Sequence, residues 1–210
     1  PDVIVISGDL ARDPASLPAL ETFLGALRAR QGKFAVWGER DHREGIVEAG
    51  GAAFLQRAGV RLLRNDSVAL RHSGGRVRIA GIDDAVTGRD SLKRAMRATA
   101  RAEFCILVSH TPAIVRSLGN WDIDLVLAGD AHGGQIRLPL IGALWAPSGS
   151  RAFIEGWHDV DPGVRLHVSR GLGWSFVPAR LFCRPRIDRI TLRAGLPPGR
   201  VAPRAVTRNS

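Results

Sequence analysis

The sequence is short of several residue types, and each scarcity excludes a class of protein or site. It has no tyrosine and only two cysteines. Cys105 and Cys183 each stand alone among apolar neighbours, which excludes a disulfide framework or a multi-cysteine zinc site and predicts two buried thiols. No basic stripe interleaved with aromatic residues occurs, so stacking-type binding of nucleic acid is not expected. No apolar run reaches the roughly eighteen residues that a transmembrane helix needs.

Lysine is also scarce, since Lys33 and Lys93 are the only lysines among 30 basic residues and all the others are arginines. The formal net charge is +10. Two interpretations of this charge stay open. A GC-rich genome would encode arginine wherever a basic residue is tolerated. Alternatively, the charge attracts an anionic partner such as a phosphate, a nucleic acid or an acidic membrane surface.

The length and composition predict one α/β domain. A chain of 210 residues, of which 45% are hydrophobic, is long enough for one substantial core. We assign residues 1–194 to this domain and residues 195–210 to a Pro/Arg-rich tail with too little apolar content to pack. The chain opens almost directly on a strand, without an initiator Met or a leader, so we expect a preceding segment to be missing. A signal or anchor could lie in that segment, which leaves a cytoplasmic and a membrane-peripheral location both open.

The first part of the sequence has the pattern of a strand–helix–strand unit. Residues 3–7 and 34–38 are apolar runs, and residues 16–32 between them carry leucines at helical spacing, which predicts parallel pairing of the two strands. Further along we expect helices over 46–58 and 91–102, buried strands over 104–110 and 123–130, and a hairpin from the segments 60–70 and 76–82. The remainder is β-rich, with expected strands over 134–140, 163–170 and 186–193.

Polar residues stand at the ends of four of these strands. Asp9 follows the first strand, Glu39 follows the second, His110 ends the third, and Asp130 and His132 follow the fourth. Each alone would be read as an ordinary turn or a hydrogen-bonded structural residue. Because ligands of open α/β sheets bind at the carboxyl ends of strands, their co-occurrence favours convergence on one point. A mixed set of carboxylates and imidazoles suits Mn, Fe or Zn, whereas an all-oxygen set would favour Mg or Ca.

The ordered motifs "GDL", "GERDH", "VSHTP" and "GDAHGGQIRLPL" resemble those of the calcineurin-like metallophosphoesterases. The usual run of that family is Asp-x-His, Gly-Asp, Gly-Asn-His-Asp/Glu, a lone His and Gly-His-x-His. The segments "HGGQIRLPLIGALWAPS" and "SRGLGWSFVPARLFCRP" resemble the bacterial branch that includes YkuE-like phosphodiesterases and UDP-diacylglucosamine pyrophosphohydrolases. The resemblance covers roughly residues 1–193. It implies a four-layer α/β/β/α sandwich, lacking its first strand in this chain, with a two-metal site at the strand ends.

The resemblance also implies roles for individual residues. Asp9 would bridge both metals, and His110 and His132 match family ligands. Glu39 stands at the position of an Asn ligand, and Asp130 at the position of a His ligand. Because carboxylates replace neutral ligands at these two positions, the site would be harder and more negative, which favours Mn or Mg over Zn and leaves Fe open.

The chain departs from the family pattern where the reaction would take place. The Asp-x-His motif is absent, so one bound metal is an alternative to two. Arg40 stands where the family has the His that protonates the leaving group; a guanidinium keeps its proton at neutral pH but can hold a phosphate oxygen. His42, two residues further on, is a second candidate for catalysis. Gly133 and Gly134 would let the backbone approach a bound phosphate closely.

These observations lead to one leading hypothesis and two alternatives. The leading hypothesis is a metal-dependent phosphoesterase that hydrolyses a phosphodiester or pyrophosphate bond. Its expected partners are a phosphate-containing small molecule or a lipid-linked nucleotide, together with a peripheral membrane contact. The first alternative is a degenerate family member that binds metal or phosphate without turnover. The second is a basic nucleic-acid-binding module, which only the net charge favours.

Overall fold

The computed structural model describes residues 1–72, 75–99, 103–161 and 163–193. The predicted tail over 195–210 and the Ser73–Gly74 turn lie outside the described residues. Within the described part of the chain, no helix combines the length and the apolar character that crossing a membrane would require.

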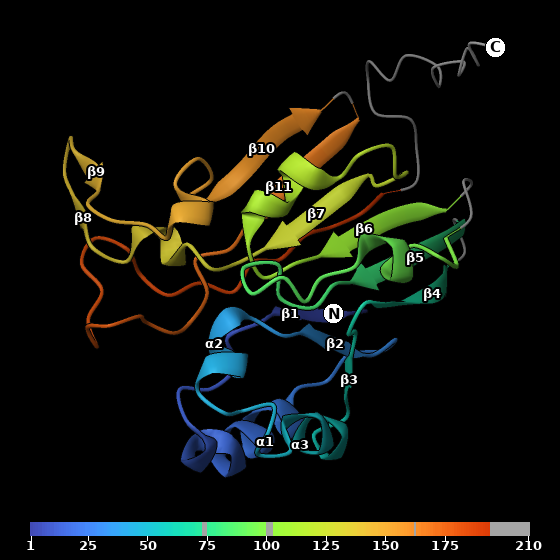
Figure 1. Cartoon of the computed structure of the whole chain (residues 1–210), viewed down its shortest axis with the longest axis horizontal. Helices are drawn as coiled ribbons and strands as arrows, with labels where there is room; N and C mark the ends of the chain where they lie inside the picture. Colours follow the sequence, from blue (N-terminus) through green and yellow to red (C-terminus); the bar gives the residue numbers. More distant parts are fainter. Residues whose placement is uncertain (73–74, 100–102, 162, 194–210) are drawn as a thin grey trace.

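Two β-sheets form the centre of the molecule (Figure 1). The smaller sheet is parallel, has the order β1-β2-β3, and consists of β1 (Ile4–Ser7), β2 (Lys33–Val36) and β3 (Val60–Leu62). The larger sheet has the order β10-β11-β7-β6-β5-β4 and consists of β4 (Asp66–His72), β5 (Gly75–Gly81), β6 (Phe104–Val108), β7 (Leu125–Ala128), β10 (Gly156–Asp161) and β11 (Val164–Val168). Its four inner strands are parallel, and its edge strands β4 and β10 are antiparallel to their neighbours. A hairpin of β8 (Arg137–Leu138) and β9 (Gly142–Ala143) projects from one end.

The helices are few and short. They are α1 (Leu17–Ala26), α2 (Glu39–Arg43), α3 (Gly51–Arg57) and α4 (Leu92–Ala95), with 3-10 turns η1 (Pro14–Ser16), η2 (Pro112–Ser117), η3 (His132–Gly134) and η4 (Ser148–Ser150). The predicted unit of strand, helix and parallel strand is confirmed as β1–α1–β2. The helix expected over 46–58 begins only at Gly51.

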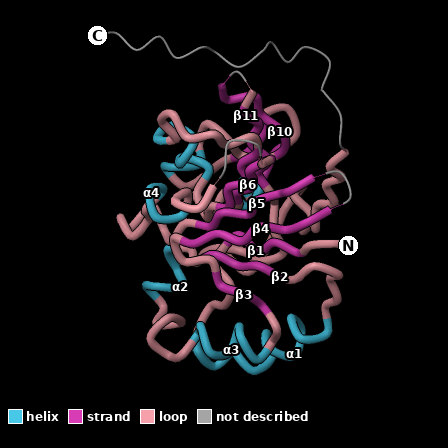
Figure 2. Tube along the Cα trace, turned by 90° about the vertical axis from the view of Figure 1, so that its right-hand side faces the viewer, coloured by secondary structure: helices cyan, strands magenta, loops and turns pink. Residues whose placement is uncertain are grey.

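Three buried clusters hold these elements together. α1 and α3 pack on the outer face of the smaller sheet around Trp37 and Phe54 (Figure 2). The facing sides of the two sheets share a second cluster, which includes Phe34 and Ile106. The third cluster covers the opposite face of the larger sheet around Leu107, under α4 and η2. The site therefore stands on a scaffold in which both sheets are packed against each other.

The mixed α/β class that the sequence predicts is confirmed. The helix expected over 91–102 is reduced, among the described residues, to the single turn of α4. Short helical turns and loops, in place of a full layer of helices, therefore cover the outer face of the larger sheet. The four-layer sandwich stays a prediction.

The segment 60–70, expected as one strand, is divided between the two sheets. β3 pairs with β2, whereas β4 pairs antiparallel with β5 in the expected hairpin. Asn65 stands between them with a φ of 56°, a left-handed conformation that asparagine tolerates. Its side-chain oxygen accepts the backbone N–H groups of Asp83 (3.1 Å) and Ser91 (2.7 Å). Both halves of the segment are apolar enough for a strand, so the pattern alone does not reveal the change of sheet.

The expected strand over 186–193 is absent, because this segment is held by single contacts instead of a ladder. The backbone N–H of Arg186 donates to the carbonyl of Gly171, and the hydroxyl of Ser169 donates to Asp188. The strands expected over 104–110, 123–130 and 163–170 are confirmed as β6, β7 and β11.

Candidate functional site

The ends of four strands meet at one cavity of about 260 Å³. Asp9 follows β1, Arg40 follows β2, His110 follows β6, and Asp130 and His132 follow β7. The rest of the lining comes largely from the loops after β1 and β11 and comprises Ser7, Gly8, Leu10, Ala11, Arg12, Gly129, Ser169, Arg170, Gly171, Leu172, Gly173 and Trp174. Since β1 and β2 belong to the smaller sheet and β6 and β7 to the larger, the cavity spans the ends of both sheets.

Two glycines allow these strand ends to come so close together. A Cβ on Gly8, whose φ is +84°, would lie 2.6 Å from the backbone nitrogen of Gly38 and 2.8 Å from Nδ1 of His110. A Cβ on Gly38 would lie 2.8 Å from Cγ of His110 and would overlap the carboxylate of Asp9. Side chains at either position would push β1, β2 and β6 apart, so the glycines are required by the shape of the site.

Asp41 in α2 is a structural carboxylate beneath the cavity that sequence reasoning missed. Its buried side chain accepts the backbone N–H groups of Asp9 (2.9 Å), Leu10 (2.8 Å) and Gly38 (2.8 Å). Burial and the charge of Asp9 raise the pKa of Asp41 to about 6, against the lowering effect of the backbone hydrogen bonds. A carboxylate three residues after the glycine that precedes a helix stands at the capping position, and that spacing could have identified it.

His110 lies at the centre of the acidic side of the cavity. Its Nδ1 lies 2.7 Å from the carbonyl oxygen of Ser7 and donates to it, which directs Nε2 at the carboxylates. Nε2 lies 3.4 Å from Oδ2 of Asp9 and 3.8 Å from Oδ1 of Asp130. Burial would lower the pKa of His110, but the charges of Asp9 and Asp130 outweigh it and raise the pKa to about 10. This part of the cavity therefore strongly favours positive charge.

The β7 loop places two predicted ligands in strained backbone conformations. Asp130 has a φ of 65° and His132 a φ of 49°. The hydroxyl of Ser150 donates to Oδ2 of Asp130 at 2.6 Å. Burial and repulsion from Arg180, whose Nη2 lies 3.4 Å from Nδ1, lower the pKa of His132 to about 4. His132 is therefore neutral at physiological pH, the form in which imidazole binds a metal or accepts a proton.

Of the two residues after Gly38, Arg40 lies in the cavity lining and Glu39 does not. Arg40 lines the cavity, and its Nη2 donates to the hydroxyl of Ser175 at 2.7 Å while its guanidinium lies over the ring of Phe176, 5.1 Å from the centroid. Glu39 is not among the lining residues and pairs with Arg43, with Oε1 3.2 Å from Nη1. Burial raises the pKa of Glu39, and repulsion from the nearby carboxylates of Asp130 and Asp9 adds to this.

His42 is held away from the cavity. Its Nε2 lies 2.8 Å from Oδ1 of Asp83, and the other oxygen of that buried carboxylate accepts Nε of Arg64 at 2.6 Å. His42 does not line the cavity. The geometry therefore gives no support to its predicted part in catalysis, because the loop after β5 supplies a buried partner, Asp83, that the sequence spacing could not show.

Packing explains why glycine is needed at Gly133 and Gly134, a reason different from the predicted close approach of the backbone to a phosphate. Neither lines the cavity. A Cβ on Gly133 would lie 2.8 Å from Cγ of Arg170 and 2.8 Å from Sγ of Cys183, and one on Gly134 would overlap Ala143 of β9. The space that these glycines leave open is filled by protein, so packing of the β7 loop requires them, and their part in substrate binding stays a prediction.

Arginine and tryptophan side chains that the motifs did not single out complete the cavity. Arg12 lies over the ring of Trp174, 4.7 Å from its centroid, and both line the cavity. Arg170 also lines it and forms an ion pair with Glu155. The only sequence signal for Arg12 is its place three residues after Asp9.

The cavity contains side chains of the types that bind divalent cations, but they are not arranged as a complete metal site. Among residues 1–72, 75–99, 103–161 and 163–193, no group of three or more His, Cys, Asp or Glu side chains is placed so that it could hold a metal ion. Nε2 of His110 is nevertheless buried without a hydrogen-bond partner, and it faces Asp9 and Asp130. An orphaned imidazole nitrogen between two carboxylates fits a cation, which would replace the proton that His110 carries in its absence.

Comparison with known proteins finds relatives along most of the chain. The uncharacterized metallophosphoesterase YkuE of Bacillus subtilis is 29% identical over 198 residues, which cover 92% of this chain and 68% of YkuE. An uncharacterized metallophosphoesterase of Aquifex aeolicus is 30% identical over 204 residues, covering 92% of this chain and 73% of that protein. Phosphodiesterase YaeI of Escherichia coli is 28% identical over 201 residues, covering 91% of this chain and 70% of YaeI.

The other comparisons add little. No family model matches the chain. The solved structure of phosphopantetheinyl hydrolase from Mycobacterium tuberculosis is similar with a TM-score of 0.44 and 8% identity, over 79% of this chain and 77% of that one.

Proposed function

The chain belongs to the metallophosphoesterase family, and on that premise we propose that it hydrolyses a phosphodiester or pyrophosphate bond with the help of a divalent metal. One observation carries the proposal. The carboxylates of Asp9 and Asp130, with the imidazole of His110 between them, line the same cavity as Arg40. The two features suit metal-assisted hydrolysis of a phosphate ester, since the carboxylates attract a cation and the guanidinium binds phosphate oxygens.

The residues of the cavity would have different roles in the reaction. Asp9, His110 and Asp130 would hold the metal, which when bound would polarise a phosphate oxygen and lower the pKa of a bound water. Arg40 is positioned by Ser175 and Phe176, so its guanidinium is already oriented for a phosphate oxygen. His132, neutral at physiological pH, can accept a proton or serve as a further ligand.

Three finer parts of the proposal rest on the sequence resemblance. Carboxylates at the positions of Glu39 and Asp130 favour manganese or magnesium over zinc. A lipid-linked nucleotide is the substrate that the UDP-diacylglucosamine pyrophosphohydrolase branch would suggest. A complete four-layer sandwich with two metals would require a strand that ends in the family's first Asp-x-His motif and precedes the strand before Asp9.

A second candidate function is binding of metal or phosphate without turnover. Arg40 occupies the position of the acid that protonates the leaving group, and His42 is tied to Asp83 instead of replacing it. Loss of general acid catalysis costs roughly 10²–10⁴-fold in rate.

The test of hydrolysis uses the protein in the longest form that its gene encodes. We expect it to cleave bis(p-nitrophenyl) phosphate when manganese is added, and an Asp9→Ala variant to lose this activity. Asp159→Ala is the matched control, because it removes an exposed carboxylate of β10 far from the cavity lining. Activity no higher than that of Asp9→Ala would contradict the proposal.

Elemental analysis separates the two candidates. Two metal ions per chain together with turnover support a hydrolase. One ion or none, with inorganic phosphate bound but no ester cleaved, supports the binding protein. An Arg40→Ala variant should then weaken phosphate binding, whereas exchange of the exposed Arg151 should not.

A further inference from the structure

One end of the molecule carries large apolar side chains that the fold leaves uncovered. Leu140 at the tip of the β8–β9 hairpin is 108% exposed and its neighbour Ile141 is 71% exposed. The segment beside the hairpin adds Phe176 at 73% and Phe182 at 68%. Single exposed apolar residues are ordinary in soluble proteins, but a gathered group of this kind marks an interaction site.

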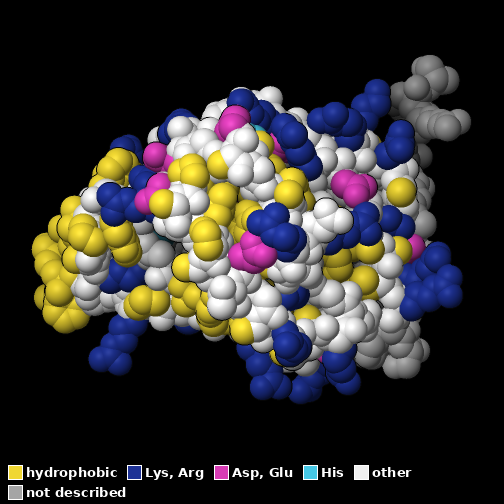
Figure 3. Space-filling view, turned by 90° about the horizontal axis from the view of Figure 1, so that it is seen from below, with side chains coloured by type: hydrophobic (Ala, Val, Ile, Leu, Met, Phe, Trp, Pro, Cys, Tyr) yellow, Lys and Arg dark blue, Asp and Glu magenta, His cyan; other side chains and the backbone are white. Residues whose placement is uncertain are grey.

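These side chains form one surface because the two segments are joined. Ile136 forms an isolated bridge with Leu181, and the N–H of Arg137 donates to the carbonyl of Leu181 at 3.0 Å. The rings of Trp145 and Phe176 meet edge to face, 5.5 Å apart. Figure 3 shows the apolar side chains gathered at the end that carries β8 and β9, with arginines among them. We call Leu140, Ile141, Trp145, Phe176, Leu181 and Phe182 the hairpin surface.

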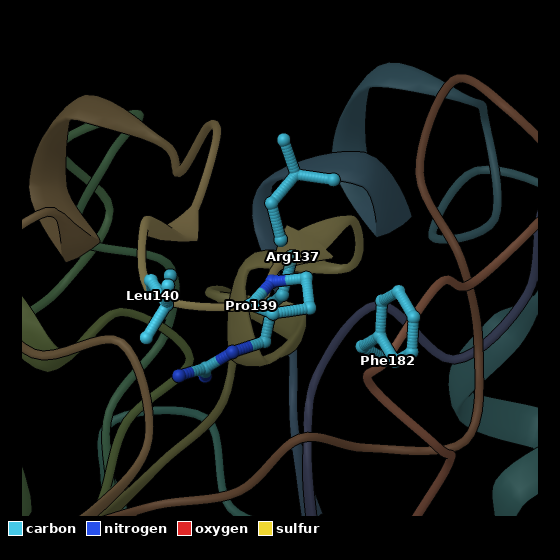
Figure 4. A pocket seen from close by; sticks show the side chains of 6 residues that line it. Arg137, Pro139, Leu140 and Phe182 are labelled. Atoms are coloured by element: carbon cyan, nitrogen blue, oxygen red, sulfur yellow. The ribbon is translucent and has the colours of Figure 1, made fainter.

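An open hollow lies within the hairpin surface. Its volume is about 400 Å³, and it is lined by the hairpin and by Phe182. Figure 4 shows Leu140 and Phe182 on opposite sides of Pro139 and Arg137. The hollow is apolar apart from Arg137, whose guanidinium pairs with Glu155. An apolar chain could therefore lie between the hairpin tip and Phe182.

The two segments that carry the hairpin surface are basic, although Glu155 beside them pairs with Arg137 and Arg170. These segments, residues 136–154 and 171–187, contain no aspartate or glutamate, and their arginines are Arg137, Arg151, Arg180, Arg184 and Arg186. Arg151 and Arg184 are exposed. The whole chain has a net charge of +10. An apolar tip surrounded by arginines is complementary to a bilayer whose interior is apolar and whose headgroups are anionic.

We propose that the hairpin surface docks the protein on an anionic lipid membrane, with Leu140, Ile141 and Phe182 entering the acyl region and the arginines contacting phosphate headgroups. A bilayer fits better than a protein partner, because the exposed apolar tip stands beside the exposed Arg151 and Arg184, which match an apolar interior bordered by anionic headgroups. Trp145 and Phe176 would lie at the interface, where aromatic rings are favoured.

The docked orientation would also bring the cavity to the membrane. The segment 171–182 supplies Phe176 to the hairpin surface and Leu172 and Trp174 to the cavity lining. Phe176 lies over the guanidinium of Arg40. If the proposed hydrolase function holds, its substrate phosphate would therefore lie at the depth of the lipid headgroups. Docking itself does not depend on hydrolysis.

The test is flotation with vesicles of phosphatidylcholine alone and of phosphatidylcholine mixed with phosphatidylglycerol. We expect the protein to float with the anionic vesicles and to bind the neutral ones more weakly. A Leu140→Asp/Ile141→Asp variant should lose binding by roughly tenfold or more, because burial of each aliphatic side chain is worth about that factor. An Arg184→Glu variant should reduce the preference for anionic vesicles.

The controls separate docking from folding and from catalysis. Phe23→Asp makes the same kind of change at an exposed apolar residue of α1, on the far side of the smaller sheet, and should leave vesicle binding unchanged. Asp9→Ala should also bind normally, so a failure of the proposed hydrolase function would not affect this result. Thermal unfolding should be the same for the hairpin variant and the unchanged protein, since the hairpin tip is exposed.

Two outcomes would overturn the proposal. The first is equal vesicle binding by the protein and its Leu140→Asp/Ile141→Asp variant, or no binding by either. The second is a dimer in light scattering that the double variant abolishes while vesicles bind neither form, in which case a second copy of the chain covers the hairpin surface.

Discussion

Asp41 shows how one buried side chain holds the cavity in shape without lining it. Its two oxygens receive three backbone N–H groups, from the loop after β1 and from the start of α2. Asp9 is one of these donors, so the position of the cavity carboxylate depends on Asp41. Asp41 has this position because it stands at the capping position of α2, and not because it is a ligand exposed in the cavity.

We predict that Asp41→Asn destabilises the protein by about 1–3 kcal/mol, because an amide cannot accept all three donors and leaves a buried N–H group unsatisfied. Urea unfolding measures this change. Asp159→Asn is the matched control, since that carboxylate is exposed on β10 and pairs only with Arg165 at the surface. Equal midpoints for the two variants would show that Asp41 does not hold the loops.

At the scale of elements, the close approach of the two sheets depends on Gly81 at the end of β5. A Cβ there would overlap Leu63 and would lie 2.8 Å from Cγ1 of Val36 in β2. The two sheets pack so tightly at this point that a methyl group has no space. Cores packed to this density lose stability when a methyl group is inserted.

We predict that Gly81→Ala lowers the free energy of unfolding by about 1–3 kcal/mol. Gly25→Ala is the matched control in α1, where a Cβ meets no atom within 4 Å. That exchange should raise the free energy of unfolding by up to about 1 kcal/mol, because alanine favours the helix. Thermal denaturation of both variants gives the comparison, and a destabilised Gly25→Ala would contradict it.

At the scale of the whole molecule, the packing predicts one cooperative unit. The facing sides of both sheets share a buried cluster that contains Phe34 and Val36 from β2 and Ile106 and Val108 from β6. If either sheet unfolded, the apolar side chains that the other sheet contributes to this cluster would be exposed to water. The cavity also takes side chains from both sheets, so the site exists only while they stay together.

We predict coincident unfolding transitions by tryptophan fluorescence and by far-ultraviolet circular dichroism. Trp37 is 1% exposed beside the smaller sheet, whereas the other tryptophans are 36–49% exposed, so fluorescence reports mainly on that side. Circular dichroism reports on all the strands and helices. Two separate midpoints would show that the sheets unfold independently.

Some features followed from the sequence because they depend on local pattern. Apolar runs located β1, β2, β6 and β7, and the polar residues after three of these runs, Asp9, His110 and Asp130, line the cavity as expected, whereas Glu39 after β2 does not and its neighbour Arg40 does. The isolated cysteines in apolar surroundings are indeed buried. The motifs also identified the family, because their order along the chain is a property of sequence alone.

Other features were decided by tertiary structure. His42 turns to Asp83 of the β5 loop, the glycines after His132 pack against other loops, and Arg12 reaches the cavity without any motif. Each outcome depends on which distant segment fills the neighbouring space. Strand periodicity and residue type set what a segment can form and which chemistry it carries. Long-range packing between segments sets which of those side chains share a cavity, since contact depends on the pairing of strands that are far apart in the chain.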